Sequence, residues 1–247
     1  NFRYVSGYGP DTSATGDRTS LTLEAANVAF NVVDGWPALD VPRALVRLDG
    51  QSFELAIPDG AITSPDGRKV TLKGAFNVDL NEALPVGHVS LRAQGPASFT
   101  NELFDRPPFR AENEPALISE KLDGRIDAQV TLFVPLGDDF KSADIKAEGR
   151  LRILDGRMKA PTGNYDITSA NITIDIAKTS ADARGELLVN GVVAKVAWQH
   201  VFGAPPEKQP PLRISALLDN SYRNQLGLDI NDLVQGDVAL EVLVSRD

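Results

Sequence analysis

Hydrophobic and polar residues alternate along almost the whole chain. In the segment VTLKGAFNVDL, which begins at Val70, apolar residues such as Leu72 and Val78 fall on one side, and polar residues such as Lys73 and Asn77 on the other. Successive side chains of a β-strand point to opposite faces of a sheet, so this pattern predicts a strand with one apolar and one polar face. The pattern recurs in later segments, and the apolar positions that we expect to share one face are Val70, Leu72, Phe76, Val78, Ile126, Val130, Leu132, Ile172, Ile174, Ile176, Leu187, Val189, Val192, Ala194, Val196, Trp198, Leu212, Ile214, Val238, Leu240 and Val242.

The dipeptide Asn190-Gly191 lies between two such segments and predicts a β-hairpin. A two-residue type I′ turn needs positive φ at both central residues, which Asn and Gly adopt readily. Such a turn pairs Val189 with Val192 and Leu187 with Ala194 on one apolar face. Asp-Gly dipeptides predict further turns, and hence a meander of antiparallel strands, at Asp34-Gly35, Asp49-Gly50, Asp59-Gly60, Asp66-Gly67, Asp123-Gly124 and Asp155-Gly156.

Helix signals are few. The segment PASFTNELFDRPP predicts a short helix capped by Ser98 or Thr100, and LDNSYRNQLG predicts a second one capped by Asp219 or Asn220 and ended by Gly227. The expected fold class is therefore all-β, with long antiparallel strands and a few short helices.

The apolar face of such a sheet must be covered by something. At roughly 33 Å² per side chain, about thirty apolar positions present on the order of 1,000 Å², well above the few hundred that soluble monomers leave exposed. A second sheet could pack on this face, helices could cover it although the sequence offers almost none, or the sheet could curl around lipid. Alternation alone favours neither, because a strand with one wet face is common to both.

The charge balance limits the partners that the chain can bind. It has 25 basic and 34 acidic residues, a net charge of -9, and its basic residues occur singly rather than in patches. Such a surface repels phosphate backbones, so nucleic acid is not an expected partner. The chain has no cysteine, which removes disulfides, thiol nucleophiles and Cys-based zinc sites. No apolar run approaches the roughly 18 residues of a membrane span, and we expect the chain to be a segment of a longer protein.

Residues that could carry enzymatic chemistry are sparse. His88 and His200 lie in different predicted strands, and structural roles are favoured for both. Asp138-Asp139 follows Pro135 in a loop, where hydration is favoured over cation binding. No nucleophile elbow, phosphate-binding loop or zinc-protease motif occurs. We therefore expect no catalytic residues, no metal, no cofactor and no enzyme activity.

Three segments resemble the C-terminal region of AsmA-like envelope proteins of the YhdP and TamB type, which are bridge-like lipid transfer proteins. They are GELLVNGVVAKVAWQHVFG, PPLRISALLDNSYRNQLGLDINDLVQGDVALEV, and Arg106-Pro107-Pro108 ahead of GRIDAQVTLFVPL. The second is the most specific, because it combines an alternating strand, Arg223, a Leu-Gly-Leu element and a Gly-led final strand. On this reading, residues 85–247 form an AsmA-like C-terminal β-groove module. Residues 1–84 form a β-rich segment that continues the same sheet.

The resemblance implies a U-shaped, gutter-like sheet whose apolar side chains bind phospholipid acyl chains. It also implies a place in the periplasm of a Gram-negative bacterium, anchored to the inner membrane by a segment absent from this chain. Phospholipids would pass between the inner and outer membranes, which parts outside this chain would contact. A β-sandwich adhesin-like or scaffold module without a lipid ligand is the alternative, and an enzyme on a β scaffold is a weaker third.

Overall fold

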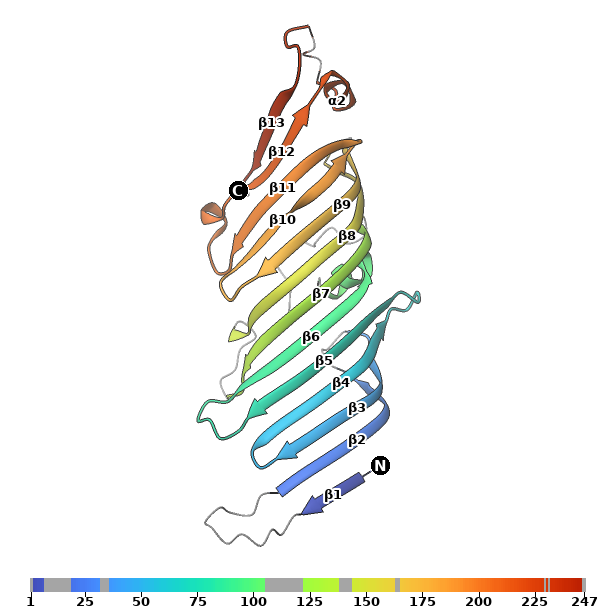
Figure 1. Cartoon of the computed structure of the whole chain (residues 1–247), viewed down its shortest axis with the longest axis vertical. Coiled ribbons are helices and arrows are strands. Elements are labelled where there is room, and N and C mark those ends of the chain that lie inside the picture. Colours follow the sequence, from blue (N-terminus) through green and yellow to red (C-terminus); the bar gives the residue numbers. More distant parts are fainter. Residues whose placement is uncertain are drawn as a thin grey trace.

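The computed structural model describes residues 2–6, 19–31, 36–104, 122–137, 144–162, 165–228, 230 and 232–245. Its 13 strands form one sheet in which each strand pairs antiparallel with its neighbours in sequence (Figure 1). The strands are β1 (Phe2–Ser6), β2 (Thr19–Phe30), β3 (Leu39–Asp49), β4 (Ser52–Thr63), β5 (Lys69–Asp79), β6 (Val86–Pro96), β7 (Leu122–Pro135), β8 (Lys146–Thr162), β9 (Tyr165–Ile176), β10 (Ser180–Val189), β11 (Val192–Val201), β12 (Leu212–Leu218) and β13 (Val238–Val244).

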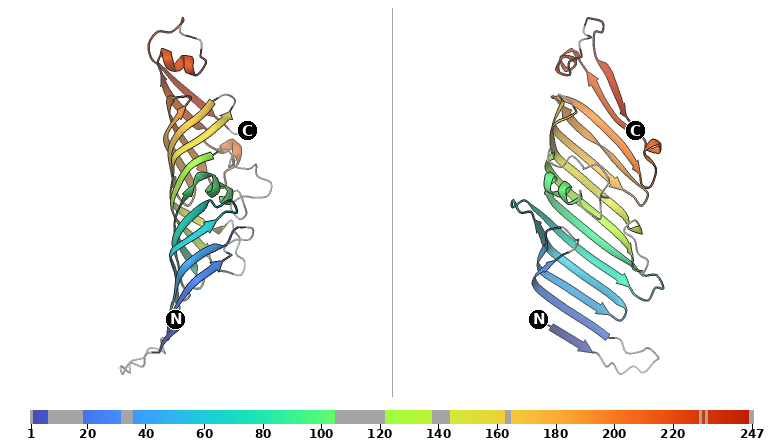
Figure 2. Two further views of the ribbon diagram at one scale, coloured as in Figure 1. Left: turned by 90° about the vertical axis from the view of Figure 1, so that its right-hand side faces the viewer. Right: turned by 180° about the vertical axis from the view of Figure 1, so that it is seen from behind.

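The sheet is long, open and curved. Its twelve strand-to-strand steps, at about 4.8 Å each, extend about 58 Å, and β1 and β13 are its edges. It curves around the side on which the helix α1 (Ala97–Phe104) lies (Figure 2). The accessible surface of the chain is 16403 Å², whereas a compact monomer of 26.6 kDa would expose about 10,700 Å². The expected fold class is confirmed: all-β, with long antiparallel strands in a curved, gutter-like sheet and a few short helices.

The hairpin expected at Asn190-Gly191 is confirmed. Asn190 has φ 48° and Gly191 has φ 84°, as a type I′ turn requires. The strands on either side, β10 and β11, pair in the expected register, with Val189 opposite Val192 and Leu187 opposite Ala194. The turn geometry and the apolar alternation therefore agree on one register.

Two of the Asp-Gly dipeptides lie at turns, as expected. Asp49-Gly50 ends β3 and leads into β4, with φ 63° at the glycine. Asp66-Gly67 lies in the loop between β4 and β5, where the Gly67 amide donates to the Ser64 carbonyl at 2.9 Å. Asp34-Gly35 lies outside the described residues.

Three other Asp-Gly dipeptides lie inside strands, so the turns expected there are wrong. Asp59-Gly60 lies in β4 beside a shift in its register with β5. Asp123-Gly124 in β7 lies opposite Asp155-Gly156 in β8, where the pairing register also shifts. Gly124 and Asp155 both have positive φ. A β-bulge uses the same left-handed backbone as a tight turn, which explains why the dipeptide alone does not separate the two.

Both expected helices form. In α1, Ser98 and Thr100 lie inside the helix rather than at its start, and the Thr100 hydroxyl donates to the Pro96 carbonyl at 3.0 Å. The second helix, α2 (Asn220–Gln225), is capped as expected, because the Asp219 carboxylate accepts from the Tyr222 amide at 2.7 Å. A short 3-10 helix, η3 (Pro206–Lys208), lies in the proline-rich loop before β12.

The apolar core is divided into small clusters along one sheet. One cluster joins β3, β4 and β5 to α1, a second joins α1 to β7 and β8, and a third lies among β9, β10, β11 and β12. The described strands form no second sheet that could pack on the first, as a β-sandwich would require. Residues before and after position 84 share the sheet, since β5 pairs with β6; the module boundary there stays a prediction. No helix among the described residues is long and apolar enough to span a membrane.

Candidate functional site

One face of the sheet is apolar across strand after strand. Residues that lie directly opposite each other in an antiparallel pair point to the same face. Following such pairs from β5 to β11 gives an unbroken row of apolar side chains, namely Leu72, Ala93, Ala128, Leu151, Ile174, Ala183 and Trp198. A parallel row continues to the edge strand β13 through Ile172, Gly185, Val196, Ile214 and Val242.

The pairing registers bring together all the residues that the sequence predicted for this face. Val196 and Leu240, which belong to different segments of the sequence, point to the same side, because Val196 faces Ile214 and Ala216 faces Leu240. The shared face of these residues is thus an observed feature of the fold. That they bind lipid stays a prediction.

Glycines on the apolar face let the strands approach closely. A Cβ atom built on Gly185 would lie 2.1 Å from the Asn171 carbonyl oxygen, and one on Gly149 would lie 2.2 Å from the Gln129 carbonyl oxygen. Both contacts are with backbone, which cannot move aside. The inner side of a curved sheet has less room per residue than the outer side, and these glycines supply that room.

The helix α1 covers part of this face. Phe99 is only 1% exposed and Leu103 is 4% exposed, and both lie in one cluster with Val41 of β3, Ile62 of β4 and Val70 of β5. The start of the helix, Ala97, packs on Ile126 and Ala128 of β7. Two of the predicted site residues, Val70 and Ile126, therefore lie in dry contacts beside α1.

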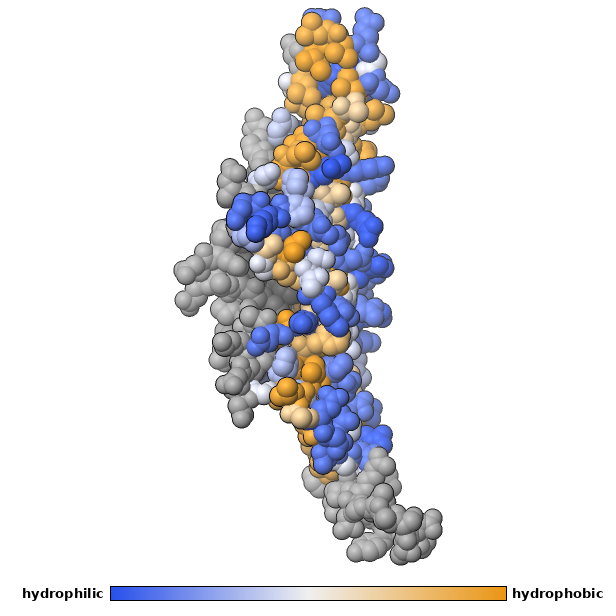
Figure 3. All heavy atoms as spheres, turned by 90° about the vertical axis from the view of Figure 1, so that its left-hand side faces the viewer, coloured by the Kyte–Doolittle hydropathy of each residue, from blue (hydrophilic) through white to orange (hydrophobic). Residues whose placement is uncertain are grey.

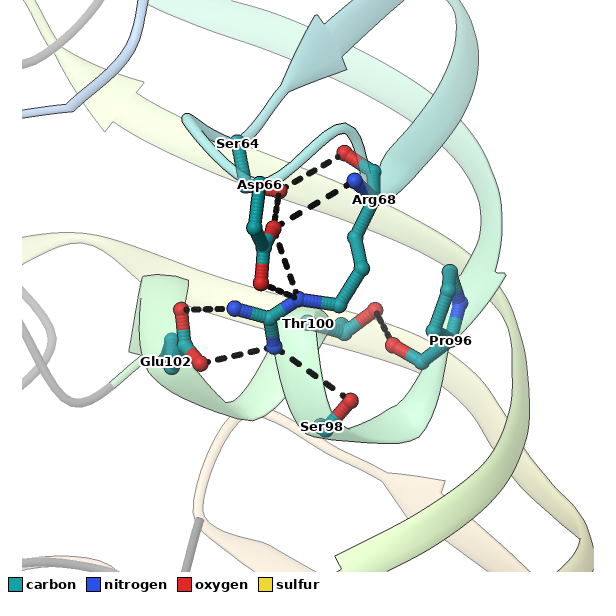
Figure 4. Close-up of polar contacts among 7 residues, drawn as sticks. All are labelled: Ser64, Asp66, Arg68, Pro96, Ser98, Thr100 and Glu102. Atoms are coloured by element: carbon teal, nitrogen blue, oxygen red, sulfur yellow. Dashed lines mark hydrogen bonds and ion pairs between the residues drawn. The ribbon is translucent and has the colours of Figure 1, made fainter. Parts of the chain in front are cut away.

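Polar contacts fix α1 to the loop between β4 and β5 (Figure 4). The Arg68 guanidinium forms two hydrogen bonds with the Glu102 carboxylate, at 2.7 and 3.1 Å, and its Nε donates to Asp66 at 2.7 Å. The same guanidinium lies 5.4 Å from the centre of the Phe99 ring. Hydrogen bonds from Arg68 and Ser64 lower the pKa of Asp66 to about 2, and those to Asp66 and Glu102 raise the pKa of Arg68. Asp66 and Arg68 therefore stay charged at neutral pH.

From β8 to β13 the apolar face is more open in the middle of the strands, whereas Val192 and Leu218, at the end beside α2, are each only 1% exposed. Ile172, Ile174, Val196 and Ile214 are half-buried, although they lie in the middle of their strands. Neighbours within the sheet bury the small Ala194 and Ala170, but no helix of the described chain joins their cluster. This open part of the face, with its aliphatic side chains, is the candidate ligand-binding site.

The opposite face of the sheet is polar. Hydrophilic residues line one side of the molecule along most of its length in Figure 3. Asp175 of β9 accepts from Arg150 of β8 at 2.6 Å and from Arg184 of β10 at 3.1 Å, and these hydrogen bonds lower the pKa of Asp175. Arg152 pairs with Asp127 at 2.8 Å. The two faces thus differ in chemistry, as a sheet with one wet and one apolar face requires.

No match to a known protein bears on this site. Neither the protein-family models, nor the curated proteins, nor the solved structures contain a match to the chain.

The residues weighed for enzymatic chemistry lie apart from one another. His88 is on the polar face, with its ring 5.2 Å from that of Phe133, and His200 stacks on Trp198 at 5.5 Å. Within the described ranges no three His, Cys, Asp or Glu side chains could together hold a metal ion. Asp138-Asp139 and the Arg106-Pro107-Pro108 element lie outside those ranges. The absence of enzyme activity stays a prediction.

Sequence reasoning missed two features of the site. The first is the close approach of the strands at Gly149 and Gly185, since alternation places a residue on a face but does not show how near the next strand lies. The second is the contact of Phe99 and Leu103 with the sheet. Their spacing of four residues was a signal, because it places both side chains on one side of a helix.

Proposed function

We propose that this chain is a segment of a lipid conduit, in which glycerophospholipids lie with their acyl chains against the apolar face of the sheet. Their headgroups would face water at the open side. The chain would act as a passive path and not as an enzyme, and it would need no cofactor. Acyl chains suit the site because its lining is aliphatic and continuous, with few polar groups to fix a ligand in one orientation.

One observation carries this proposal. The apolar face runs across the whole sheet, yet the half-buried side chains of β8 to β13 have no second layer of described residues over them. Apolar surface of this extent is costly in water and usually marks a binding surface.

On this proposal the chain works in the periplasm of a Gram-negative bacterium and carries phospholipids between the inner and outer membranes. The membrane contacts, including an inner-membrane anchor, belong to parts outside this chain. The resemblance to AsmA-like envelope proteins supports this placement.

The test compares two substitutions on opposite faces of one strand. Val196→Asp puts a carboxylate on the open apolar face, whereas Ala197→Asp puts one on the polar face, directly opposite Arg184 and Arg213. We expect the unmodified chain and Ala197→Asp to purify with bound phospholipid. We expect Val196→Asp to stay folded and to lose most of that lipid. Solvent extraction followed by mass spectrometry gives the lipid per chain, and circular dichroism checks the fold.

The outcomes separate the proposal from its alternative. If the unmodified chain carries no phospholipid, or if both variants carry as much as it does, the conduit proposal fails. A lipid-free chain with a stable fold would instead favour a scaffold module.

A further inference from the structure

The strands of the sheet end along two rims, and the two rims are covered differently. At one rim, here called the helix rim, α1 follows β6 and α2 follows β12, and the turn Asn190-Gly191 lies beside them (Figure 1). The opposite rim, here called the open rim, carries the turns after β3 and β9, the loop after β5 and the end of β11. Among the described helices only the three-residue η3 lies at the open rim.

At the helix rim the apolar face of β10 to β12 is aliphatic and closed. Leu187, Val192 and Leu218 there are 8%, 1% and 1% exposed. The helix α2 adjoins the turn between β10 and β11, because a Cβ atom built on Gly191 would lie 3.5 Å from the side-chain oxygen of Gln225. An acyl chain that reaches this rim therefore ends against protein and not against water.

At the open rim the same face ends in three aromatic side chains. Trp198, His200 and Phe202 occupy alternate positions at the end of β11 and directly after it. The His200 ring stacks on the Trp198 ring at 5.5 Å and meets the Phe202 ring edge-on at 5.6 Å. Trp198 and His200 are half-buried, and Phe202 is 44% exposed. The Gln209 amide fixes the loop beside them by donating to the Ala204 carbonyl at 2.8 Å.

Such rings suit the boundary between hydrocarbon and water. Tryptophan and histidine combine an apolar body with a polar ring nitrogen, and tryptophan is enriched where acyl chains give way to headgroups. Six residues separate Val192 from Trp198 in β11, which is about 20 Å at about 3.4 Å per residue. The hydrocarbon of one bilayer leaflet is about 15 Å thick, half of the roughly 30 Å core. An acyl chain that begins beside Trp198 therefore ends near Val192.

We propose that a bound glycerophospholipid has its headgroup at Trp198, His200 and Phe202 and its acyl chains along the strands toward the helix rim. This inference rests on the proposed lipid binding and adds the direction in which the lipid lies. The reverse orientation would place a charged headgroup among Leu187, Val192 and their neighbours, where nothing apolar gains from it and the loss of hydration is costly.

Fluorescence quenching tests the orientation, because the sequence has only two tryptophans. Trp36→Phe leaves Trp198 as the single reporter at the open rim. Adding Trp198→Phe and Ile167→Trp moves the reporter to the helix rim, since Ile167 lies opposite Val189. Each variant is loaded with phosphatidylcholine that carries a nitroxide on the headgroup or at the end of an acyl chain. Each is then separated from free lipid by gel filtration.

We expect the headgroup nitroxide to remove most of the Trp198 fluorescence and the chain-end nitroxide to remove little of it. The tryptophan at position 167 should show the reverse order. Circular dichroism checks the fold of each variant, and the Trp198 measurement alone decides the orientation.

Electron spin resonance of the bound labels tests the role of the rings. The double substitution Trp198→Leu and His200→Leu keeps the face apolar but removes both polar rings, so the headgroup nitroxide should become more mobile and the chain-end nitroxide should not. His88→Leu is the matched control, because His88 lies near the same rim on the polar face, and it should change neither label.

The results separate this inference from the proposal on which it rests. If labelled lipid is bound but the chain-end nitroxide quenches Trp198 as strongly as the headgroup nitroxide, the proposed orientation is wrong and lipid binding stands. An unchanged headgroup mobility in the double variant likewise removes the role of the two rings. If mass spectrometry finds no labelled lipid on the chain, the conduit proposal fails and this inference fails with it.

Discussion

Replacing Phe99 with alanine should release α1 from the sheet without unfolding the sheet. Phe99 is 1% exposed and fills a cluster with Val41, Ala44 and Val70. Truncating a buried phenylalanine costs about 3–5 kcal/mol. The helix contacts the sheet on one side only, so the protein can accommodate this loss by local opening rather than by global unfolding. At about 1.4 kcal/mol per factor of ten, the open population should rise roughly 100- to 4,000-fold.

Thiol labelling measures this opening directly, because the chain has no cysteine. Ala44→Cys places a single thiol in the cluster that includes Phe99, and Val192→Cys places one at an equally buried position in β11, outside that cluster. Phe99→Ala should accelerate labelling of the thiol at position 44 roughly 100- to 4,000-fold. It should leave the labelling rate of the thiol at position 192 unchanged. If the first rate changes less than about threefold, or if both rates rise together, the local-opening reasoning is wrong.

The polar cluster should contribute much less than the apolar contacts. The side chains of Arg68 and Glu102 are 30% and 34% exposed, so solvent screens their attraction. A pair of this kind is worth up to about 1 kcal/mol, or roughly a fivefold change in opening. Glu102→Gln should therefore accelerate labelling of the thiol at position 44 far less than Phe99→Ala does.

Three further predictions concern the sheet, the loop before β5 and the end beside α2. Gly185→Ala should lower the urea midpoint, because its Cβ would lie 2.1 Å from a backbone oxygen and overpacking of this kind costs about 1–3 kcal/mol. Asp66→Asn should be less stable than the unmodified chain at neutral pH. The folded pKa of about 2 lies below the ordinary aspartate pKa of 3.8, so the stabilisation is present above pH 3.8 and is lost as the pH falls toward 2. The melting temperatures of the two proteins should converge there. Arg223→Met should speed hydrogen exchange in α2 but not in β2 to β10, because it removes the donor to the carbonyls of Leu218, Val234 and Gly236, at about 1–3 kcal/mol for the buried carbonyl of Leu218.

The sheet and its register could be predicted because both follow from local rules. Side chains of a strand alternate between two faces, so the apolar positions fix which face is buried. Asn190-Gly191 then fixes the pairing of β10 with β11, since no other two-residue turn suits that sequence as well. Each further strand is held in register by the same requirement that apolar residues face the same side.

The bulges and the docking of α1 could not be predicted in this way. Asp155-Gly156 provides a positive φ, which serves a turn or a bulge equally, and the neighbouring strand decides between them. The helix around Phe99 was predicted from its own segment, but its partners Val41 and Ile62 are distant in sequence. Their contact depends on how the whole sheet curves, which local patterns do not specify.

The position of α1 has a consequence for the proposed function. A lipid path along the apolar face requires side chains that contact a fluid ligand, and the half-buried residues of β8 to β13, such as Ile174 and Ile214, meet that requirement. Val70 and Ile126 share the same face and phase, yet they lie in dry clusters with α1.

Binding of acyl chains along the full sheet would therefore have to replace the contacts of Phe99 with contacts of lipid. The apolar face is covered whether α1 or lipid lies on it. Replacing α1 by lipid therefore loses mainly the polar contacts of Arg68 and the specific packing of the helix on the sheet. The same alternation of residues thus serves as a protein core at one end of the sheet and as a candidate lipid surface at the other.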